Sequence, residues 1–500
     1  MKNKIVTIIL YFISFVAILL FCSAIWVKKT FGQISIDSFF YTVTSGLEGT
    51  ESGMVFKYFT GPFLIAVLII IAAIVIPRLN YKNIPFLNFK IFKFKFEWNI
   101  FKIIDKIKIA IPFILLVGSM FFVYKYFDIE GYIRTNLVYT TFIEDHYVDP
   151  KTAKIEFKEK RNLIHIYVES LEVTFSDKAN GGVLDFNLIP NLTNLSKEED
   201  SVRFSSSTGL GFYNTRATNW TIAGMLGQTA GINLITYHPE DYGATGPFLP
   251  GVYSLGEILA DNGYKNVLFI GSDANFGARN NYFEKHGNYE IKDYYYAIEK
   301  GYIPGDYYEW WGIEDGKLFE FAKKEINELA QGDQPFNFTM LTTNTHHIGG
   351  FTESFCEKTY DESQYNAIKC SDQEVYDFVR WIQDQDFYEN TTIVITGDHI
   401  SMEPELFEQY ESFYDRTCFN LFINPYKKTE YTNNRLFTTL DIYPTTVYSL
   451  GGEIEGNKLG LGVNLFSGEK TLYETYGRMG TEYEMQFNSK FYQEKLMKNK

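Results

Sequence analysis

Three uninterrupted apolar runs lie in the first quarter of the chain. They cover residues 5–27, 58–77 and 109–124, and none contains a charged side chain. A helix of about 20 apolar residues crosses the ~30 Å hydrocarbon core of a bilayer. The third run is shorter, but lysines flank it and can extend to the head groups. The pattern predicts three transmembrane helices, at about 5–27, 55–77 and 108–126. The alternative is a signal peptide followed by two buried helices.

Beyond residue 160 short apolar runs alternate with stretches in which apolar residues recur every three to four positions. The runs are typical of strands, and the stretches are typical of helices. Alternating strands and helices indicate an α/β domain with a largely parallel sheet. We therefore expect an anchor over 1–126, a tether over 127–160 and a folded domain over 161–500. The expected strands are 163–168, 267–271, 336–341, 391–396 and 419–423, and the expected helices are 253–262, 317–330 and 372–383.

The distribution of charged residues also separates residues 1–126 from the rest of the chain. The 500 residues include 46 basic and 61 acidic side chains, a net charge of -15 that is typical of a soluble acidic protein. Residues 1–126, however, hold 14 of the basic and only 5 of the acidic side chains, which leaves +9 there and -24 in the remainder. The acidic balance argues against a nucleic-acid partner, because binding a phosphate backbone needs concentrated Lys and Arg. The two parts are expected to occupy different environments.

The basic residues also predict an orientation. Residues 78–108 hold eight Lys or Arg and two acidic side chains, whereas residues 28–54 hold two basic and three acidic ones. Basic loops stay in the cytoplasm, so residues 127–500 are expected outside. An oxidising exterior would let Cys356 and Cys370 form a disulfide. The alternative is a pair of free thiols.

Chemically active side chains gather directly after the expected strands. In open α/β sheets, functional groups meet at the carboxyl ends of the strands. Each of these side chains has an ordinary alternative as a helix cap or a surface residue, but their coincidence favours one site. Two carboxylates and an imidazole suit Mn²⁺, Zn²⁺ or Mg²⁺, and a guanidinium suits phosphate or sulfate oxygens. The side chains are Glu169, Arg279, His346 with His347, and Asp398 with His399.

Several runs resemble, in order, the motifs of the alkaline phosphatase/sulfatase superfamily, and more narrowly of its phosphoglycerol transferase branch. The resemblance implies an alkaline-phosphatase-like α/β sandwich with a central, largely parallel sheet, preceded here by the α-helical anchor. Residues 276–295 are similar to the segment that carries the family's phosphate-binding arginine. The other runs are YVESLE at 167–172, TNWTIAGMLGQTAGI at 218–232, TTNTHH at 342–347 and TGDHISM at 396–402.

The resemblance also implies roles for single residues. The sulfatase form needs a C/S-x-P-x-R signature, and none lies near Trp220. Thr221, in the run Asn219-Trp220-Thr221, matches the position of the transferase nucleophile in the family. Its alternative role is a helix N-cap, and that helix terminus would still favour an anion. His-x-Pro is frequent in relatives where Ile348 stands here, so His346 or His347 could contact the phosphate. The implied metal ligands are Glu169, Thr221, Asp398 and His399, the implied proton-transfer residue is His346, and the implied substrate contacts are Arg279, His347 and Trp311.

These assignments imply a metal-dependent enzyme that transfers glycerol phosphate from phosphatidylglycerol to a glycan hydroxyl through a phospho-threonine. One divalent ion is implied, with Mn²⁺ favoured over Zn²⁺ and Mg²⁺. The alternative within the superfamily is a phosphoethanolamine transferase that acts on lipid A or a cell-surface glycan. A membrane binding or sensing protein that has kept the fold is a different class of alternative. The implied location is the bacterial cytoplasmic membrane, with the catalytic domain at 161–500 facing outward.

Overall fold

The computed structural model forms two compact units. The first contains residues 1–36 and 50–133, and the second contains residues 37–49 and 134–500. Most of the lysine-rich loop expected between the second and third spans lies outside the described residues, as does residue 77, the expected end of the second span. The structure describes residues 2–31, 36, 38–39, 41, 52–76, 87–91, 94–98, 107, 109–237, 241–243, 245–407, 409–410 and 412–498.

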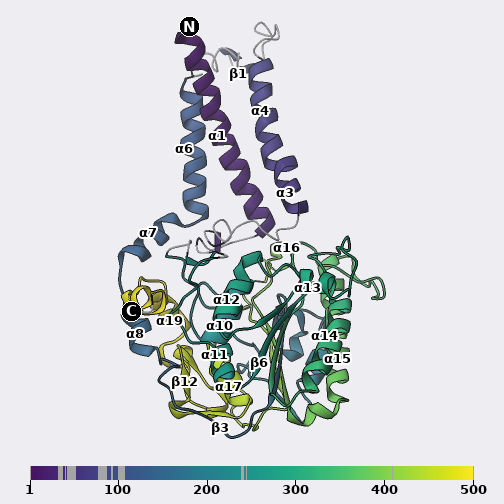
Figure 1. Cartoon of the computed structure of the whole chain (residues 1–500). Coiled ribbons are helices and arrows are strands. Elements are labelled where there is room, and N and C mark those ends of the chain that lie inside the picture. Colours follow the sequence, from purple (N-terminus) through teal and green to yellow (C-terminus); the bar gives the residue numbers. More distant parts are fainter. Residues whose placement is uncertain are drawn as a thin grey trace. The chain divides into compact units, whose positions relative to one another are not determined.

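Apolar helices make up most of the first unit (Figure 1). Helix α1 (Lys2–Phe31) packs against α4 (Leu64–Val75) and α6 (Ala110–Tyr126). Two segments, Lys4–Phe31 and Gly53–Val75, are long and apolar enough to cross a membrane. A third crossing is possible if α6 and α7 (Ile129–Leu137), which are bent by 59° relative to one another, form one span. The other elements are α3 (Ser52–Tyr58), a π-helical turn at Phe59–Phe63, and a hairpin of β1 (Leu87–Ile91) and β2 (Phe94–Trp98).

A seven-stranded sheet forms the centre of the second unit, in the order β5-β10-β9-β4-β8-β6-β7. The five strands from β9 to β7 pair in parallel, while β10 runs antiparallel to both of its neighbours. The expected strands are confirmed, and two short edge strands are added. Their bounds are β4 (Asn162–Val168), β5 (Ser201–Val202), β6 (Lys265–Ile270), β7 (Glu290–Lys292), β8 (Phe336–Leu341), β9 (Thr391–Gly397) and β10 (Asn420–Ile423).

Alternating side chains of β4 divide the core between the two faces of the sheet. Ile164 and Ile166 join the apolar cluster that includes α14 (Asp315–Ala330) and α15 (Ser363–Gln383). Tyr167 points to the opposite face and joins the cluster that includes α10 (Thr221–Ala230). Figure 1 shows helices on both sides of the sheet. This is the arrangement that parallel strands need, because both of their faces are apolar.

Shorter elements surround this core. Strand β3 (Ile155–Phe157) lies within the expected tether and pairs with β11 (Gly452–Ile454). Cys356 and Cys370 form a disulfide, and Cys418 is buried. The remaining elements are α8 (Phe142–His146), α9 (Pro190–Leu195), α11 (Leu255–Asp261), α12 (Arg279–Lys285), α13 (Tyr294–Glu299), α16 (Pro404–Phe407), α17 (Ile442–Ser449), α18 (Leu472–Tyr476), α19 (Arg478–Met485), β12 (Lys458–Leu459) and β13 (Gly462–Val463).

Candidate metal and phosphate site

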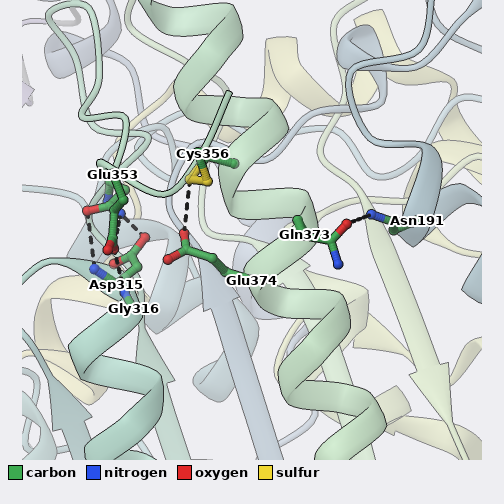
Figure 2. Close-up of a disulfide and its surroundings, with 9 residues drawn as sticks. Asn191, Asp315, Gly316, Glu353, Cys356, Gln373 and Glu374 are labelled. Atoms are coloured by element: carbon green, nitrogen blue, oxygen red, sulfur yellow. Dashed lines mark hydrogen bonds between the residues drawn. A yellow bond between two sulfur atoms is a disulfide. The ribbon is translucent and has the colours of Figure 1, made fainter. Parts of the chain in front are cut away.

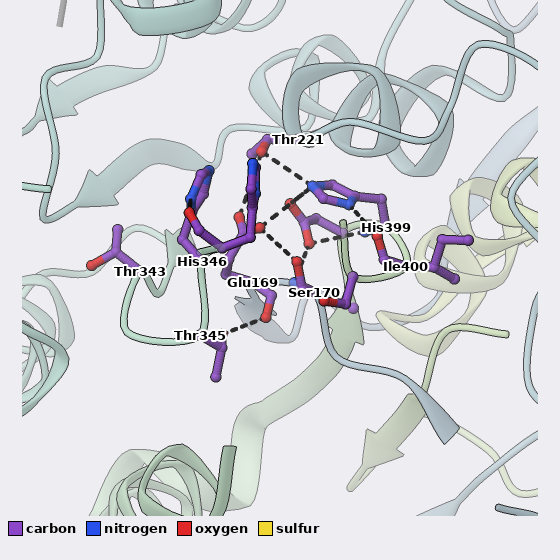
Figure 3. A network of polar contacts seen from close by, with 12 residues as sticks. Glu169, Ser170, Thr221, Thr343, Thr345, His346, His399 and Ile400 are labelled. Atoms are coloured by element: carbon purple, nitrogen blue, oxygen red, sulfur yellow. Dashed lines mark hydrogen bonds and ion pairs between the residues drawn. The ribbon is translucent and has the colours of Figure 1, made fainter. Parts of the chain in front are cut away.

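Two adjacent central strands end at the candidate site. The register pairs Val168 of β4 with Gly397 of β9, so Glu169 and Asp398 follow at neighbouring strand ends. Both carboxylates are buried, with exposed fractions of 2% and 0%. One ligand atom each from Glu169, Asp398 and His399 lies within 4.8 Å of the others. Figure 3 shows Glu169 and His399 drawn together with Thr221.

Hydrogen bonds orient Glu169, Asp398 and His399 and leave one atom of each side chain available to bind a metal. Asp398 Oδ1 accepts from the N–H groups of Ser170 (2.8 Å) and His399 (2.9 Å), while Oδ2 is buried without a hydrogen-bond partner among the described residues. His399 Nδ1 donates to the Ile400 carbonyl at 2.7 Å, so in the neutral ring Nε2 carries the lone pair. The Ser170 hydroxyl donates to Glu169 Oε1 at 2.8 Å. This arrangement is typical of metal ligands, whose orientation is set by their neighbours.

The distances between the candidate ligand atoms are those expected around a small divalent ion. Thr221 Oγ1 lies 3.5 Å from Glu169 Oε2 and 3.4 Å from His399 Nε2. His399 Nε2 in turn lies 3.4 Å from Glu169 Oε1 and 3.3 Å from Asp398 Oδ2. Ligands held about 2.0–2.1 Å from a tetrahedral ion are about 3.3–3.4 Å apart. These four separations match the spacing of ligands around one tetrahedral divalent ion.

The charges of these side chains also favour a bound cation. Burial, and then the nearby charge of Glu169, raises the pKa of Asp398 to about 7. Burial lowers the pKa of His399, but the charges of Asp398 and Glu169 outweigh that effect, and the net shift is upward. Two carboxylates enclosed together repel one another and are poorly solvated. A divalent cation between them would remove this penalty.

Arg279 supplies a buried positive charge. Its Nη2 donates to Ser272 Oγ at 3.1 Å and to the Asp273 carbonyl at 2.7 Å, while Nε has no hydrogen-bond partner among the described residues. The guanidinium carbon lies 5.5 Å from the centre of the Phe276 ring. Burial lowers the pKa of Arg279 to about 10, so the side chain remains charged at neutral pH. A fixed guanidinium with a free N–H suits an anionic oxygen.

Aromatic contacts connect the arginine segment to the two histidines. Ring centres are 5.4 Å apart for Phe276 and Trp311, 4.4 Å for Trp311 and His346, and 4.6 Å for His346 and His347. His346 Nδ1 donates to the His347 carbonyl at 2.6 Å, which leaves the lone pair on Nε2. Burial lowers the pKa of His346 to about 4, so the ring is neutral at pH 7 and can accept a proton. The pKa of His347 is also lowered by burial.

All of the predicted site residues thus lie on connected segments at one edge of the sheet, but several supporting residues were missed. Thr345 donates to the Glu169 carbonyl, and Gln228 donates to the Gly397 carbonyl at 2.9 Å. Ser170 adopts a φ of 58°, which brings its N–H toward Asp398. Ser, Thr and Gln are common in turns and helices, so only their proximity to the motifs distinguishes them in the sequence.

The chain is similar to several known proteins. Phosphoglycerol transferase I of Xanthomonas campestris pv. campestris (strain B100) is 33% identical over 276 residues, covering 54% of this chain and 37% of that protein. The protein of the same name from Escherichia fergusonii is 31% identical over 334 residues, covering 65% and 41%. The chain thus spans about two fifths of the length of these relatives. The structure of lipoteichoic acid synthase LtaP from Listeria monocytogenes aligns with a TM-score of 0.49 at 16% identity, covering 66% of this chain and 82% of that one.

A family model described as Sulfatase matches residues 161–451, which is more than half of the chain. Members of this superfamily typically bind a divalent metal, in keeping with the cluster of Glu169, Asp398 and His399. The expected α/β fold with a central sheet is confirmed. The chain therefore belongs to the sulfatase family of the alkaline phosphatase superfamily.

Proposed function

We propose that the protein transfers glycerol phosphate from phosphatidylglycerol to a glycan hydroxyl through a covalent intermediate on Thr221. The observation that carries this proposal is the position of the Thr221 hydroxyl, 3.4 Å from His399 and 3.5 Å from Glu169 at the first residue of α10. A helix N-terminus favours an anion such as the donor phosphate. The relatives named phosphoglycerol transferase I support glycerol phosphate as the transferred group.

Glu169, Thr221, Asp398 and His399 would hold one divalent ion, for which we favour Mn²⁺, with Zn²⁺ and Mg²⁺ as alternatives. Such an ion lowers the pKa of a coordinated hydroxyl and offsets negative charge on the phosphoryl oxygens. The lone pairs left on Asp398 Oδ2 and His399 Nε2 support this assignment.

The first step forms a bond between Thr221 Oγ and the donor phosphorus and breaks the bond from phosphorus to the diacylglycerol oxygen. His346 Nε2 takes the hydroxyl proton of Thr221 and passes it to the departing diacylglycerol oxygen. The neutral state of His346 supports its role as the acceptor. Arg279 binds a phosphoryl oxygen through its free Nε–H throughout the step.

The second step releases the enzyme. A glycan hydroxyl attacks the same phosphorus, and the bond from phosphorus to Thr221 Oγ breaks. His346 accepts the proton of the attacking hydroxyl and returns a proton to Thr221, so both groups regain their starting states. Trp311 and His347 would line the space beside the glycerol group, a role supported by the contacts that connect both rings to His346.

A membrane anchor suits this donor. We propose that the apolar helices hold the protein in the bacterial cytoplasmic membrane as a multi-pass protein, with the catalytic domain outside. The charge distribution around the apolar runs supports that orientation. The head group of phosphatidylglycerol lies at the bilayer surface, so anchoring raises the effective concentration of donor at the site.

Thr221→Ala, with Thr221→Ser as its matched control, tests the proposal in the full chain with phosphatidylglycerol vesicles. Loss of the nucleophile should lower transfer at least about 1,000-fold, whereas the serine variant retains a hydroxyl and measurable transfer. Metal content should change little in either variant, because three other ligands remain. Mass spectrometry of a trapped Thr221 adduct would identify the group, and a phosphoethanolamine adduct would favour the alternative donor. Unchanged transfer by Thr221→Ala would exclude the mechanism.

A further inference from the structure

Tyr41 lies between two apolar helices in the sequence but belongs to the second unit. The chain leaves the first unit after residue 36 and returns to it at residue 50. Tyr41 is only 2% exposed, and it is part of the apolar cluster that contains Trp220 and Ala278. A side chain from the segment that joins α1 to α3 therefore completes the core of the domain that carries the site.

The contacts of Tyr41 reach two segments of the site. Its hydroxyl donates to the Gly277 carbonyl at 2.6 Å, two residues before Arg279. Its ring centre lies 5.7 Å from that of Trp220, the residue directly before Thr221. Tyr41 thus touches the segment that presents the arginine and the segment that presents the proposed nucleophile.

The arginine segment has a backbone that needs such support. Gly277 (φ 64°) and Ala278 (φ 54°) are consecutive left-handed residues. For a residue with a Cβ, such as alanine, this conformation costs about 1–2 kcal/mol. The turn is held by the bond from Tyr41 and by the Ala278 N–H, which donates to the Asn275 carbonyl at 2.9 Å. Directly after the turn, Arg279 begins α12 and folds its guanidinium back toward Ser272 and Asp273.

We propose that Tyr41 is a positioning residue for phosphate binding, which rests on the function proposed above. By holding the Gly277 carbonyl and packing on Trp220, it sets the place of the Arg279 guanidinium relative to the Thr221 hydroxyl. It acts through these neighbours and does not contact the phosphate itself. The segment between the first two apolar helices therefore contributes to the geometry of the site as well as connecting those helices.

Tyr41→Phe in the full chain tests this role, and Tyr242→Phe is its matched control. The Tyr242 hydroxyl is also buried and donates to a main-chain carbonyl, that of Ile235, at 2.7 Å. Each substitution removes one such hydrogen bond, so both should lower thermal stability by similar amounts. Only Tyr41→Phe should weaken the binding of inorganic phosphate in the presence of Mn²⁺, by about fivefold to tenfold, as measured by calorimetry.

The two proposals fail in different ways. Equal phosphate affinity in the two variants would overturn the positioning role, whatever the activity of the wild-type protein. A wild-type protein that binds phosphate but transfers no glycerol phosphate would overturn the proposed function, while a selective loss of phosphate affinity in Tyr41→Phe would still support the positioning role. A similar loss of phosphate affinity in Tyr242→Phe would show a general effect of destabilising the core and would also overturn the positioning role.

Discussion

Two groups of buried acidic side chains lie in the second unit, and their surroundings differ. The ligand group consists of Glu169 and Asp398 with His399 (Figure 3). The disulfide group consists of Asp315, Glu353 and Glu374 beside Cys356–Cys370 (Figure 2). No carboxylate in either group is more than 7% exposed, so burial alone does not distinguish them.

In the disulfide group, main-chain N–H groups and a bound proton lower the free-energy cost of burying the acidic side chains. Asp315 accepts from the N–H groups of Thr343 (2.7 Å) and Asn344 (2.9 Å), and Glu353 accepts from the Gly316 N–H at 2.6 Å. Burial, and then the charges of Asp315 and Glu353, raises the pKa of Glu374 far above its ordinary value, so this carboxyl is protonated at neutral pH.

In the ligand group, atoms of several side chains face one another across a short distance. Asp398 Oδ2, like Glu374 Oε1, has no hydrogen-bond partner among the described residues, but here His399 Nε2 lies 3.3 Å from Asp398 Oδ2, 3.4 Å from Glu169 Oε1 and 3.4 Å from the Thr221 hydroxyl. The comparison teaches that a candidate metal site is marked by converging atoms of several ligand types. Buried acidity by itself is a weaker sign, because protons and N–H groups can satisfy it.

The largest expected difference concerns metal affinity. Asp398→Asn should lower the affinity for Mn²⁺ by more than about 100-fold, because it replaces a charged ligand whose Oδ2 is free. Glu374→Gln makes the same change of acid to amide in the disulfide group and should leave metal content unaltered. Elemental analysis of both purified variants measures the contrast. Equal metal content would remove the proposed distinction between the two groups.

A smaller effect is expected from removing the disulfide. Replacing Cys356 and Cys370 together by serine opens a link across 14 residues, and such links contribute about 3 kcal/mol to the free energy of unfolding. Urea titration of the full chain, without reductant, measures the loss. Metal content at low urea should match the wild type, so a parallel loss of metal would indicate that the two groups are coupled.

The smallest effect is a change in the pH dependence of stability. The folded protein keeps a proton on Glu374 at pH values where the unfolded chain, with an ordinary pKa of 4.5, has lost it. The wild type therefore loses stability as pH rises above that value. Glu374→Gln removes this loss, so its free energy of unfolding should exceed that of the wild type by about 1–3 kcal/mol at pH 8 and by less at pH 5. Urea titrations at both pH values test the sign, and an equal gap at both would contradict it.

Apolar patterning predicted the five principal strands because each is a short, mostly apolar or β-branched run that is buried on both faces, as in β4 and β9. The edge strands β5 and β7 have two and three residues, which is too short for a periodic signal. The expected helix at 372–383 begins earlier, at Ser363. Its first turns bury the polar Gln364 and Asn366 together with Ala367 and Ile368, and the polar residues in this stretch resemble those of a loop.

The candidate ligands were predictable from their positions after strands and from the ordered motifs, but their support was not. The bonds from Ser170 to Glu169 and Asp398 depend on a left-handed backbone that no local pattern requires of a serine. The contact of Tyr41 with Gly277 joins residues 236 positions apart, and it follows from tertiary packing alone. The local sequence therefore predicts which side chains form the candidate site, whereas tertiary contacts determine how those side chains are oriented.

The register of β4 against β9 has a consequence for folding fidelity. Val168 faces Gly397, and the candidate ligands Glu169 and Asp398 follow immediately. A slip of one residue would displace one carboxylate by about 3.3 Å along the sheet and turn its side chain toward the opposite face. A misaligned chain could not bring the two carboxylates to one ion. A divalent ion present during folding would therefore stabilise only molecules with correctly paired central strands, and metal uptake would report that pairing.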